Sequence, residues 1–226
     1  MSQPIRLLVV DDDPMVREAY RSFFAGQPDF DLCGEAVNGD EGVRAFEKLR
    51  PDVVLMDLQM PVLSGIDAIQ RICTRRPEAC IVAMTTFGTQ EFVIAALRAG
   101  ASGYLLKDVG GPALVGGLRQ AIAGDMPLSG TVRRELVASV VTDAPPVAAA
   151  DPAVEVTPRE RELLGWLAQG LTNQQIGAQM YLSVGSVKQY LSHVGTKLAA
   201  KSRTGILIRA VQLGLVDPQA LPTVRA

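Results

Sequence analysis

The sequence predicts a doubly wound α/β domain with a parallel sheet, followed by a smaller all-α domain. In the first half of the chain, five short apolar runs alternate with five amphipathic stretches, a pattern typical of strand–helix units with buried strands. The stretch VTDAPPVAAADPA at 141–153 then breaks every apolar periodicity and has the composition of an extended linker. A chain of 226 residues also fits two domains of ordinary size. We therefore expect a first domain at 1–125, a helix and linker at 126–153, and a second domain at 154–220.

The predicted strands are short, and most are continuous and rich in β-branched residues. Right-handed crossovers between parallel strands favour a flavodoxin-like (βα)5 order, in which the first and third strands are neighbours. The carboxyl ends of all five strands then meet along one edge of the sheet. The strands are expected at 5–10, 31–37, 53–56, 80–84 and 103–106.

The segments that follow these strands carry apolar residues at helical spacing. Pro112 suits a first helical position, and Gly26 and Gly100 suit C-terminal caps. Asp13 stands at the head of the first helix, where a carboxylate suits the helix dipole. Helices are expected at 14–25, 40–49, 65–75, 90–99 and 112–123, with a further helix at 131–140 leading into the linker.

The second domain contains repeated signals for helix starts. Thr-Pro-Arg-Glu at 157–160 forms a capping box, and Thr172 with Gln175 repeats this pattern. Ser183 caps a third helix, and a fourth is expected at 203–213. The turn between the second and third helices is only three or four residues long, which predicts a helix-turn-helix. The buried stripe of the third helix consists of Val187, Leu191, Val194 and Leu198.

Composition excludes several classes of protein. No apolar stretch approaches the length of a membrane span, and residues 1–6 are too polar for a secretory signal, so we expect a cytoplasmic protein with no membrane partner. The three cysteines form no CxxC pair, which favours buried thiols over metal ligands or disulfides. His193 is the only histidine, which excludes a metal site built from several histidines.

Charge divides the chain in the same place as the linker. Up to Val154 there are 20 acidic and 14 basic residues, a net charge of −6. From Glu155 onward there are 4 acidic and 8 basic residues, a net charge of +4. The two domains are therefore expected to bind different partners.

Asp57 ends the apolar run at 52–57 and is the strongest candidate for a chemical centre. Acidic residues follow the first strand, Thr85 ends the fourth, and Lys107 follows the fifth, so all should converge at the carboxyl edge of the sheet. A carboxylate that attacks an anionic phosphoryl group needs a divalent cation, and Mg²⁺ prefers oxygen ligands such as those of Asp11 and Asp12. Lys107 can offer a point charge, and the Thr85 hydroxyl can bind a phosphoryl oxygen.

At these residues the chain resembles the receiver domains of two-component response regulators. The resemblance covers residues 5–123 and implies that Asp57 accepts a phosphoryl group from the phosphohistidine of a sensor histidine kinase and also binds the metal. The matching motifs are Asp11-Asp12, Asp57 in MDLQMP, Thr85 in MTTF, and Tyr104 and Lys107 in GYLLK.

The same resemblance implies the roles of the residues around Asp57. Asp12 would be the main metal carboxylate, with help from Asp11, and the backbone carbonyl of Gln59 would complete the metal site. Thr85 would shift toward the phosphoryl group while Tyr104 rotates inward. Such a switch requires an element with two stable arrangements that the phosphoryl group can bias.

The third helix of the second domain presents polar side chains that suit a DNA major groove. Lys188 can contact guanine or phosphate, and Gln189 can pair with adenine. The segment 155–217 resembles LuxR-type DNA-binding domains through VTPRE and NQQIGAQMYLSVGSVKQYLSHVGTKL. The resemblance implies binding to double-stranded promoter DNA. The candidate DNA contacts are Ser183, Ser186, Lys188, Gln189, Ser192, Lys197, Lys201 and Arg203.

The third helix departs from that family at Tyr190, where histidine is common, and at two further positions. Ser192 and Thr196 stand where basic residues are frequent, so fewer phosphate contacts are expected. Fewer contacts predict weak binding by a single domain and a shallow dependence on salt. We therefore expect a homodimer when the chain is phosphorylated.

Together the two resemblances predict a transcriptional response regulator of the NarL/FixJ type, rather than an enzyme that turns over a substrate. One alternative is an atypical regulator of the same fold that works without phosphorylation. Another is a phosphatase similar to haloacid dehalogenases, in which LLVVDDD would supply Asp11 as the nucleophile and Asp13 as the acid. The phosphatase reading leaves Asp57 without a role.

Overall fold

The computed structural model describes residues 3–86, 90–128 and 154–216. The chain divides into two compact units, Met1–Ala123 and Gly124–Ala226. The division falls just before the predicted boundary at 125, and Asp125 accepts a hydrogen bond from the backbone N–H of Asn173 within the second unit (2.8 Å). The predicted helix at 131–140 and the linker at 141–153 lie outside the described residues.

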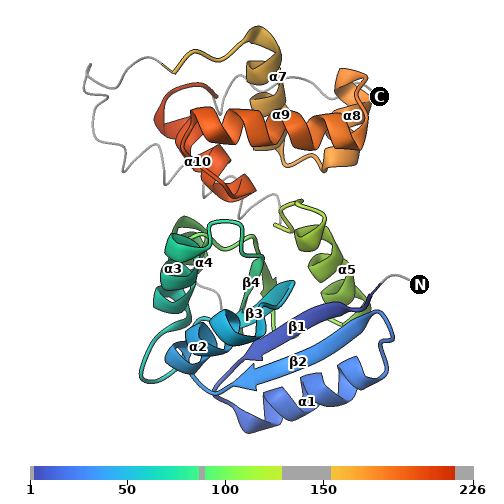
Figure 1. Cartoon of the computed structure of the whole chain (residues 1–226), viewed down its shortest axis with the longest axis vertical. Helices are drawn as coiled ribbons and strands as arrows, with labels where there is room; N and C mark the ends of the chain where they lie inside the picture. Colours follow the sequence, from blue (N-terminus) through green and yellow to red (C-terminus); the bar gives the residue numbers. More distant parts are fainter. Residues whose placement is uncertain (1–2, 87–89, 129–153, 217–226) are drawn as a thin grey trace. The chain divides into compact units, whose positions relative to one another are not determined.

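The first unit contains a five-stranded sheet in the order β2-β1-β3-β4-β5 (Figure 1). All four strand pairs are parallel, which confirms the predicted order. In the register, Val10 lies beside Met56, and Asp57 lies beside Met84, so the carboxyl ends of β1, β3 and β4 are adjacent. The strands are β1 (Ile5–Val10), β2 (Phe30–Ala36), β3 (Val53–Asp57), β4 (Ile81–Thr85) and β5 (Gly103–Leu106).

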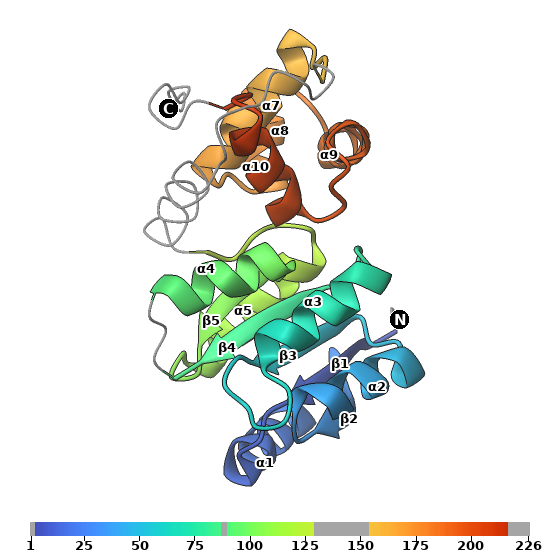
Figure 2. The same cartoon turned by 90° about the vertical axis from the view of Figure 1, so that its left-hand side faces the viewer.

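Helices cover both faces of this sheet (Figures 1 and 2). Phe24 of α1 and Leu114 and Leu118 of α5 share one core with inward side chains of the central strands. Burying each such side chain contributes about 1.5–3 kcal/mol. Helices α2, α3 and α4 cover the opposite face. The helices are α1 (Pro14–Ala25), α2 (Gly39–Leu49), α3 (Gly65–Arg75), α4 (Gln90–Ala99) and α5 (Gly111–Ile122).

Short polar side chains set where the helices of the first unit begin. Asp13 caps α1 by accepting a hydrogen bond from the backbone N–H of Met15 (2.8 Å). Asn38 and Ser64 cap α2 and α3 in the same manner. The bounds of these strands and helices differ from the predicted ones by no more than one residue.

The second unit contains four described helices, and both predicted capping boxes are present. Thr157 with Glu160 starts the first helix, and Thr172 with Gln175 starts the second. Ser183 caps the third, as predicted, by accepting a hydrogen bond from the backbone N–H of Ser186. The helices are α7 (Pro158–Gln169), α8 (Asn173–Met180), α9 (Val184–Lys197) and α10 (Arg203–Gln212). None of the helices in the described part of the chain has the length and apolar character needed to span a membrane.

The turn between α8 and α9 folds closely against α8. The backbone N–H of Leu182 donates to the carbonyl of Gly177 (2.8 Å), and Tyr181 adopts a left-handed conformation with φ 56°. A Cβ atom on Gly177 would lie 2.6 Å from the carbonyl oxygen of Leu182. The helix-turn-helix therefore requires a residue without a side chain at this position.

Replacing Gly177 with alanine is expected to destabilise the second unit by about 1–3 kcal/mol, because α8 or the turn must shift to relieve the clash. Urea unfolding followed by the fluorescence of Trp166, the only tryptophan of the chain, measures the stability of this unit. Gly185→Ala on α9 is the matched control, since the nearest atom to its Cβ would be 3.7 Å away. Equal midpoints for the two variants would contradict the steric argument.

Candidate functional site

Three strand ends bring one lysine and three carboxylates together at the carboxyl edge of the sheet. Lys107 Nζ, just after β5, lies 2.7 Å from Asp11 Oδ2 and 3.0 Å from Asp57 Oδ2. One carboxylate oxygen each from Asp11, Asp12 and Asp57 lies within 4.8 Å of the other two. The predicted convergence of these residues is therefore present in the structure.

The carboxylates of this cluster differ in burial. Asp11 and Asp57 are only 2% and 5% exposed, whereas Asp12 is exposed to solvent. Burial raises the pKa of Asp57 against the opposing effect of Lys107, and the neighbouring Asp11 raises it further. Burial alone would lower the pKa of Lys107, but its hydrogen bonds to both carboxylates outweigh that effect and raise it. The ammonium and the two buried carboxylates thus stabilise one another.

The cluster carries more negative charge than Lys107 neutralises. Burial, followed by the charges of Asp11 and Asp57, raises the pKa of the nearby Tyr20 to about 12. Three carboxylates that face one ammonium leave an excess of negative charge, which a divalent cation bound by their oxygens can neutralise.

Thr85 and Tyr104 occupy the last two strands of the sheet. Thr85 is 2% exposed, whereas the adjacent Thr86 is exposed. The carbonyl of Thr85 accepts a hydrogen bond from the backbone N–H of Lys107 (3.0 Å), so the main chains at these two strand ends are joined. Tyr104 is half-buried on β5, and burial, together with the charge of Asp108, raises its pKa. Their switch roles stay predictions.

Gln59 and Gly65 shape the loop that follows Asp57 at the end of β3. The backbone N–H of Gln59 lies 3.4 Å from Asp57 Oδ1. Gly65, which sequence reasoning missed, donates its N–H to the carbonyl of Leu58 (3.1 Å). A Cβ atom on Gly65 would lie 1.8 Å from the carbonyl oxygen of Asp57. Glycine at this position lets α3 start directly against the backbone of the candidate acceptor.

The outward face of α9 presents the polar residues that the sequence predicts there. Lys188, Gln189 and Ser192 are exposed, whereas Val187 and Leu191 on the opposite side are buried. Ser183 and Ser186 hydrogen-bond to each other through their hydroxyl groups (2.9 Å) at the start of the helix. Lys201 is exposed beyond its end. This exposed polar face is the one that the sequence predicts to contact DNA.

Two predicted DNA contacts are engaged inside the second unit instead. Lys197 Nζ donates to the Glu160 carboxylate at 2.8 Å. The side chain of Arg203 is 8% exposed and donates to Asn173 Oδ1 at 2.7 Å. A DNA phosphate would have to compete with these buried partners, so the roles of Lys197 and Arg203 as DNA contacts stay predictions.

Glu160 links the start of α7 to the end of α9. Its carboxylate accepts hydrogen bonds from the backbone N–H of Thr157 (2.7 Å) and from Lys197, and His193 Nε2 lies 3.7 Å away. Burial alone would raise the pKa of Glu160, but the hydrogen bonds from Lys197 and Thr157 outweigh it and lower that pKa. The capping box was visible in the sequence, whereas the bond to Lys197 was not.

Comparison with known proteins identifies the family. Residues 7–119 match the response regulator receiver domain, and residues 155–210 match the luxR family of bacterial regulatory proteins. The chain is 36% identical over 202 residues to the nitrate/nitrite response regulator protein NarL of Escherichia coli (strain K12), covering 89% of this chain and 92% of NarL. The chain is a response regulator of the NarL/FixJ type.

Two further relatives agree with this assignment. The regulator is 35% identical over 213 residues to the uncharacterized transcriptional regulatory protein YxjL of Bacillus subtilis (strain 168), covering 94% of this chain and 98% of YxjL. The crystal structure of ChrA, a response regulator in a heme-sensing two-component system, matches with a TM-score of 0.51 and 31% identity, over 95% of this chain and all of that one. The predicted class, a two-component transcriptional regulator, is confirmed over the phosphatase alternative.

Removing the charge of Lys107 is expected to destabilise the receiver domain of the response regulator. In EDTA, Lys107→Met should lower the free energy of unfolding by about 3 kcal/mol, because Asp11 and Asp57 would remain buried without a partner. Added Mg²⁺ should restore much of this loss. Urea unfolding followed by circular dichroism measures the effect, and Trp166 fluorescence reports the unfolding of the second unit separately. Lys48→Met, an exposed lysine on α2, is the control; an equal loss there would contradict the pairing argument.

The bond between Glu160 and Lys197 predicts a pH dependence for the second unit. Because the folded pKa of Glu160 is lowered, its contribution to stability is present above the usual glutamate pKa and is lost as pH falls through the folded value. Glu160→Gln should lower the urea midpoint at neutral pH, and the gap to the parent protein should narrow in acid. Trp166 fluorescence reports both midpoints. A gap that stays constant with pH would show that the charge of Glu160 does not matter.

Proposed function

We propose that Asp57 accepts a phosphoryl group from a sensor histidine kinase and that phosphorylation controls binding of the response regulator to promoter DNA. The observation that carries this proposal is Lys107 Nζ, which lies between the Asp11 and Asp57 carboxylates with Asp12 beside them. The ammonium is within hydrogen-bond distance of the carboxylate that would attack. It can therefore move to the negatively charged oxygens of the phosphoryl group once this group is bound to Asp57.

Phosphoryl transfer requires that like charges approach one another. The carboxylates of Asp11, Asp12 and Asp57 and the main-chain carbonyl of Gln59 would hold Mg²⁺, which supplies the positive charge that offsets this repulsion. An oxygen of Asp57 attacks the phosphorus of the phosphohistidine, and the P–N bond breaks as the new P–O bond forms. The imidazole nitrogen keeps the bonding electrons and takes a proton from water. The regulator then holds the phosphoryl group as a signal.

Modification of Asp57 would change the surroundings of Lys107. A phosphoryl group draws the ammonium toward its oxygens, and the Thr85 hydroxyl can donate a hydrogen bond to the same group. Because the Lys107 N–H is bonded to the Thr85 carbonyl, movement at one strand end is transmitted to the other. Tyr104, half-buried on β5 beside these positions, would rotate inward as the space behind Thr85 opens.

The DNA-binding domain would place α9 in a major groove. Lys188, Gln189 and Ser192 would read base edges, and the hydroxyl groups of Ser183 and Ser186 would contact phosphates at the start of the helix. Lys201 would add one phosphate contact. Since Lys197 and Arg203 are engaged internally, the affinity of one domain should be low, which supports binding as a homodimer.

Asp57→Asn tests the proposal. With acetyl phosphate and Mg²⁺, a gel that separates phosphorylated protein should show a shifted band for the parent chain and none for the variant, because the amide cannot form the acyl phosphate. Asp31→Asn, an exposed aspartate on β2, should keep the shift. A shifted band that persists in Asp57→Asn would sink the assignment of the acceptor.

Genome-wide footprinting of the same variants connects the acceptor to DNA. Protected sites should be found with the phosphorylated parent chain and should be weaker with Asp57→Asn. Lys188→Ala should weaken them by about tenfold or more, since one base contact contributes about 1–3 kcal/mol. Footprints that are equal in Asp57→Asn would favour the regulator that works without phosphorylation.

A further inference from the structure

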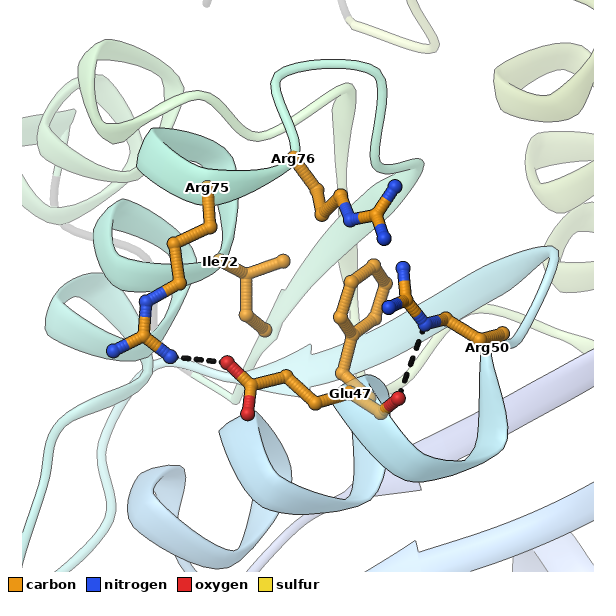
Figure 3. Close-up of a pocket in the computed structure, with 6 residues that line it drawn as sticks. Glu47, Arg50, Ile72, Arg75 and Arg76 are labelled. Atoms are coloured by element: carbon orange, nitrogen blue, oxygen red, sulfur yellow. Dashed lines mark hydrogen bonds and ion pairs between the residues drawn. The ribbon is translucent and has the colours of Figure 1, made fainter.

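A small cavity lies between the carboxyl-terminal ends of α2 and α3, away from Asp57 (Figure 3). Each helix runs back from the carboxyl end of one strand to the start of the next, so these helix ends lie at the opposite edge of the sheet from the candidate acceptor. The cavity has a volume of about 200 Å³ and is lined by Phe46, Glu47, Arg50, Ile72, Arg75 and Arg76. We call it the α2–α3 arginine pocket.

The lining of this pocket combines an apolar floor with an excess of positive charge. Phe46 and Ile72 are buried members of the core. The remaining four side chains are three guanidinium groups and one carboxylate, a net charge of +2 in a chain whose overall net charge is −2. The charged side chains themselves are exposed to solvent at the mouth of the pocket, so their attraction for an anion depends on several guanidinium groups acting together rather than on burial.

The three arginines are not equally neutralised. Arg75 forms an ion pair with the Glu47 carboxylate. Arg50 donates through Nε to the backbone carbonyl of Glu47 (3.0 Å), and its two terminal nitrogens have no hydrogen-bond or ion-pair partner among the described residues. Arg76 lies 3.6 Å from the carboxylate of Glu78, a largely exposed pair that contributes little in water. The guanidinium groups of Arg50 and Arg76 point toward each other (Figure 3).

Helix capping accounts for Arg50 Nε, which donates to a carbonyl in the last turn of α2, but not for the terminal nitrogens of Arg50 or for the guanidinium of Arg76. Arginines near a helix carboxyl terminus ordinarily bind its last carbonyl groups. At the end of α2, however, Arg6 already donates to the carbonyls of Leu49 and Arg50. The terminal nitrogens of Arg50 therefore remain available, and Arg76 is held only by its exposed ion pair with Glu78. An anion between these two like charges would relieve their repulsion.

We propose that the α2–α3 arginine pocket binds a small molecule that carries two adjacent phosphoryl groups. Guanidinium groups pair with phosphate oxygens through two parallel hydrogen bonds, and two facing guanidiniums offer one such fork to each phosphoryl group. A single carboxylate or orthophosphate would engage only part of this donor set. Inorganic pyrophosphate and a nucleoside diphosphate share the required chemistry.

Isothermal titration calorimetry of the full-length protein with pyrophosphate tests whether the pocket binds a diphosphate. The buffer contains EDTA and little salt, so that the carboxylates around Asp57 repel the anion and only a positively charged site can bind it. Arg76→Gln and Arg50→Gln should each weaken binding by at least about tenfold, because a neutral amide replaces a charged fork of two hydrogen bonds. Arg44→Gln removes the same charge from α2 at a residue that pairs with Asp40 outside the pocket, and should leave the affinity within about twofold.

Comparing the affinities of pyrophosphate and ADP shows whether the pocket recognises the diphosphate alone or a nucleoside diphosphate. Equal affinity for pyrophosphate and ADP would mean that only the diphosphate is recognised, and tighter binding of ADP would mean that the nucleoside is contacted as well. Orthophosphate should bind at least about tenfold more weakly than either. The proposal is overturned if neither diphosphate binds, if orthophosphate binds as well as pyrophosphate, or if Arg44→Gln weakens binding as much as the two pocket variants. Circular dichroism confirms that each variant is folded.

Discussion

The bridge from Lys107 to Asp11 and Asp57 is the interaction on which the first domain depends. Two carboxylates that are 2% and 5% exposed would repel each other and lose their hydration, and the ammonium at 2.7 and 3.0 Å offsets both costs. It places a positive charge against the buried carboxylate of Asp57, the proposed acceptor, and still leaves a net negative site. The β2-β1-β3-β4-β5 order makes this possible, because it sets the ends of β1 and β3 side by side.

Close approach of the backbone, rather than the choice of reactive side chain, decides the geometry of both functional regions. At Gly65, the start of α3 lies against the carbonyl of Asp57, and at Gly177, the helix-turn-helix turn lies against α8. In each place a Cβ atom would overlap a carbonyl oxygen of a neighbouring segment. Backbone atoms cannot rotate away as a side chain can, so each glycine fixes the position of an element of a candidate functional region.

Charge in the second domain serves two purposes that the sequence does not separate. Lys188 and Lys201 are exposed, whereas Lys197 and Arg203 bind Glu160 and Asn173 within the domain. The net charge of +4 from Glu155 onward therefore overstates what the domain can offer to DNA phosphates. In the first domain the reverse holds, since Arg50 and Arg76 sit in an acidic half of the chain and yet form a local positive site.

The sequence by itself determined the order and bounds of the elements, because apolar periodicity, capping residues and prolines act over a few positions. It also determined which residues end β1, β3, β4 and β5, and parallel topology then required Asp11, Asp57, Thr85 and Lys107 to converge. Only the tertiary structure decided which charges are paired and which glycines are indispensable. Lys197 and Glu160 are 37 positions apart, and Arg203 and Asn173 are 30 apart. Such contacts depend on how helices pack against one another, which local sequence patterns do not determine.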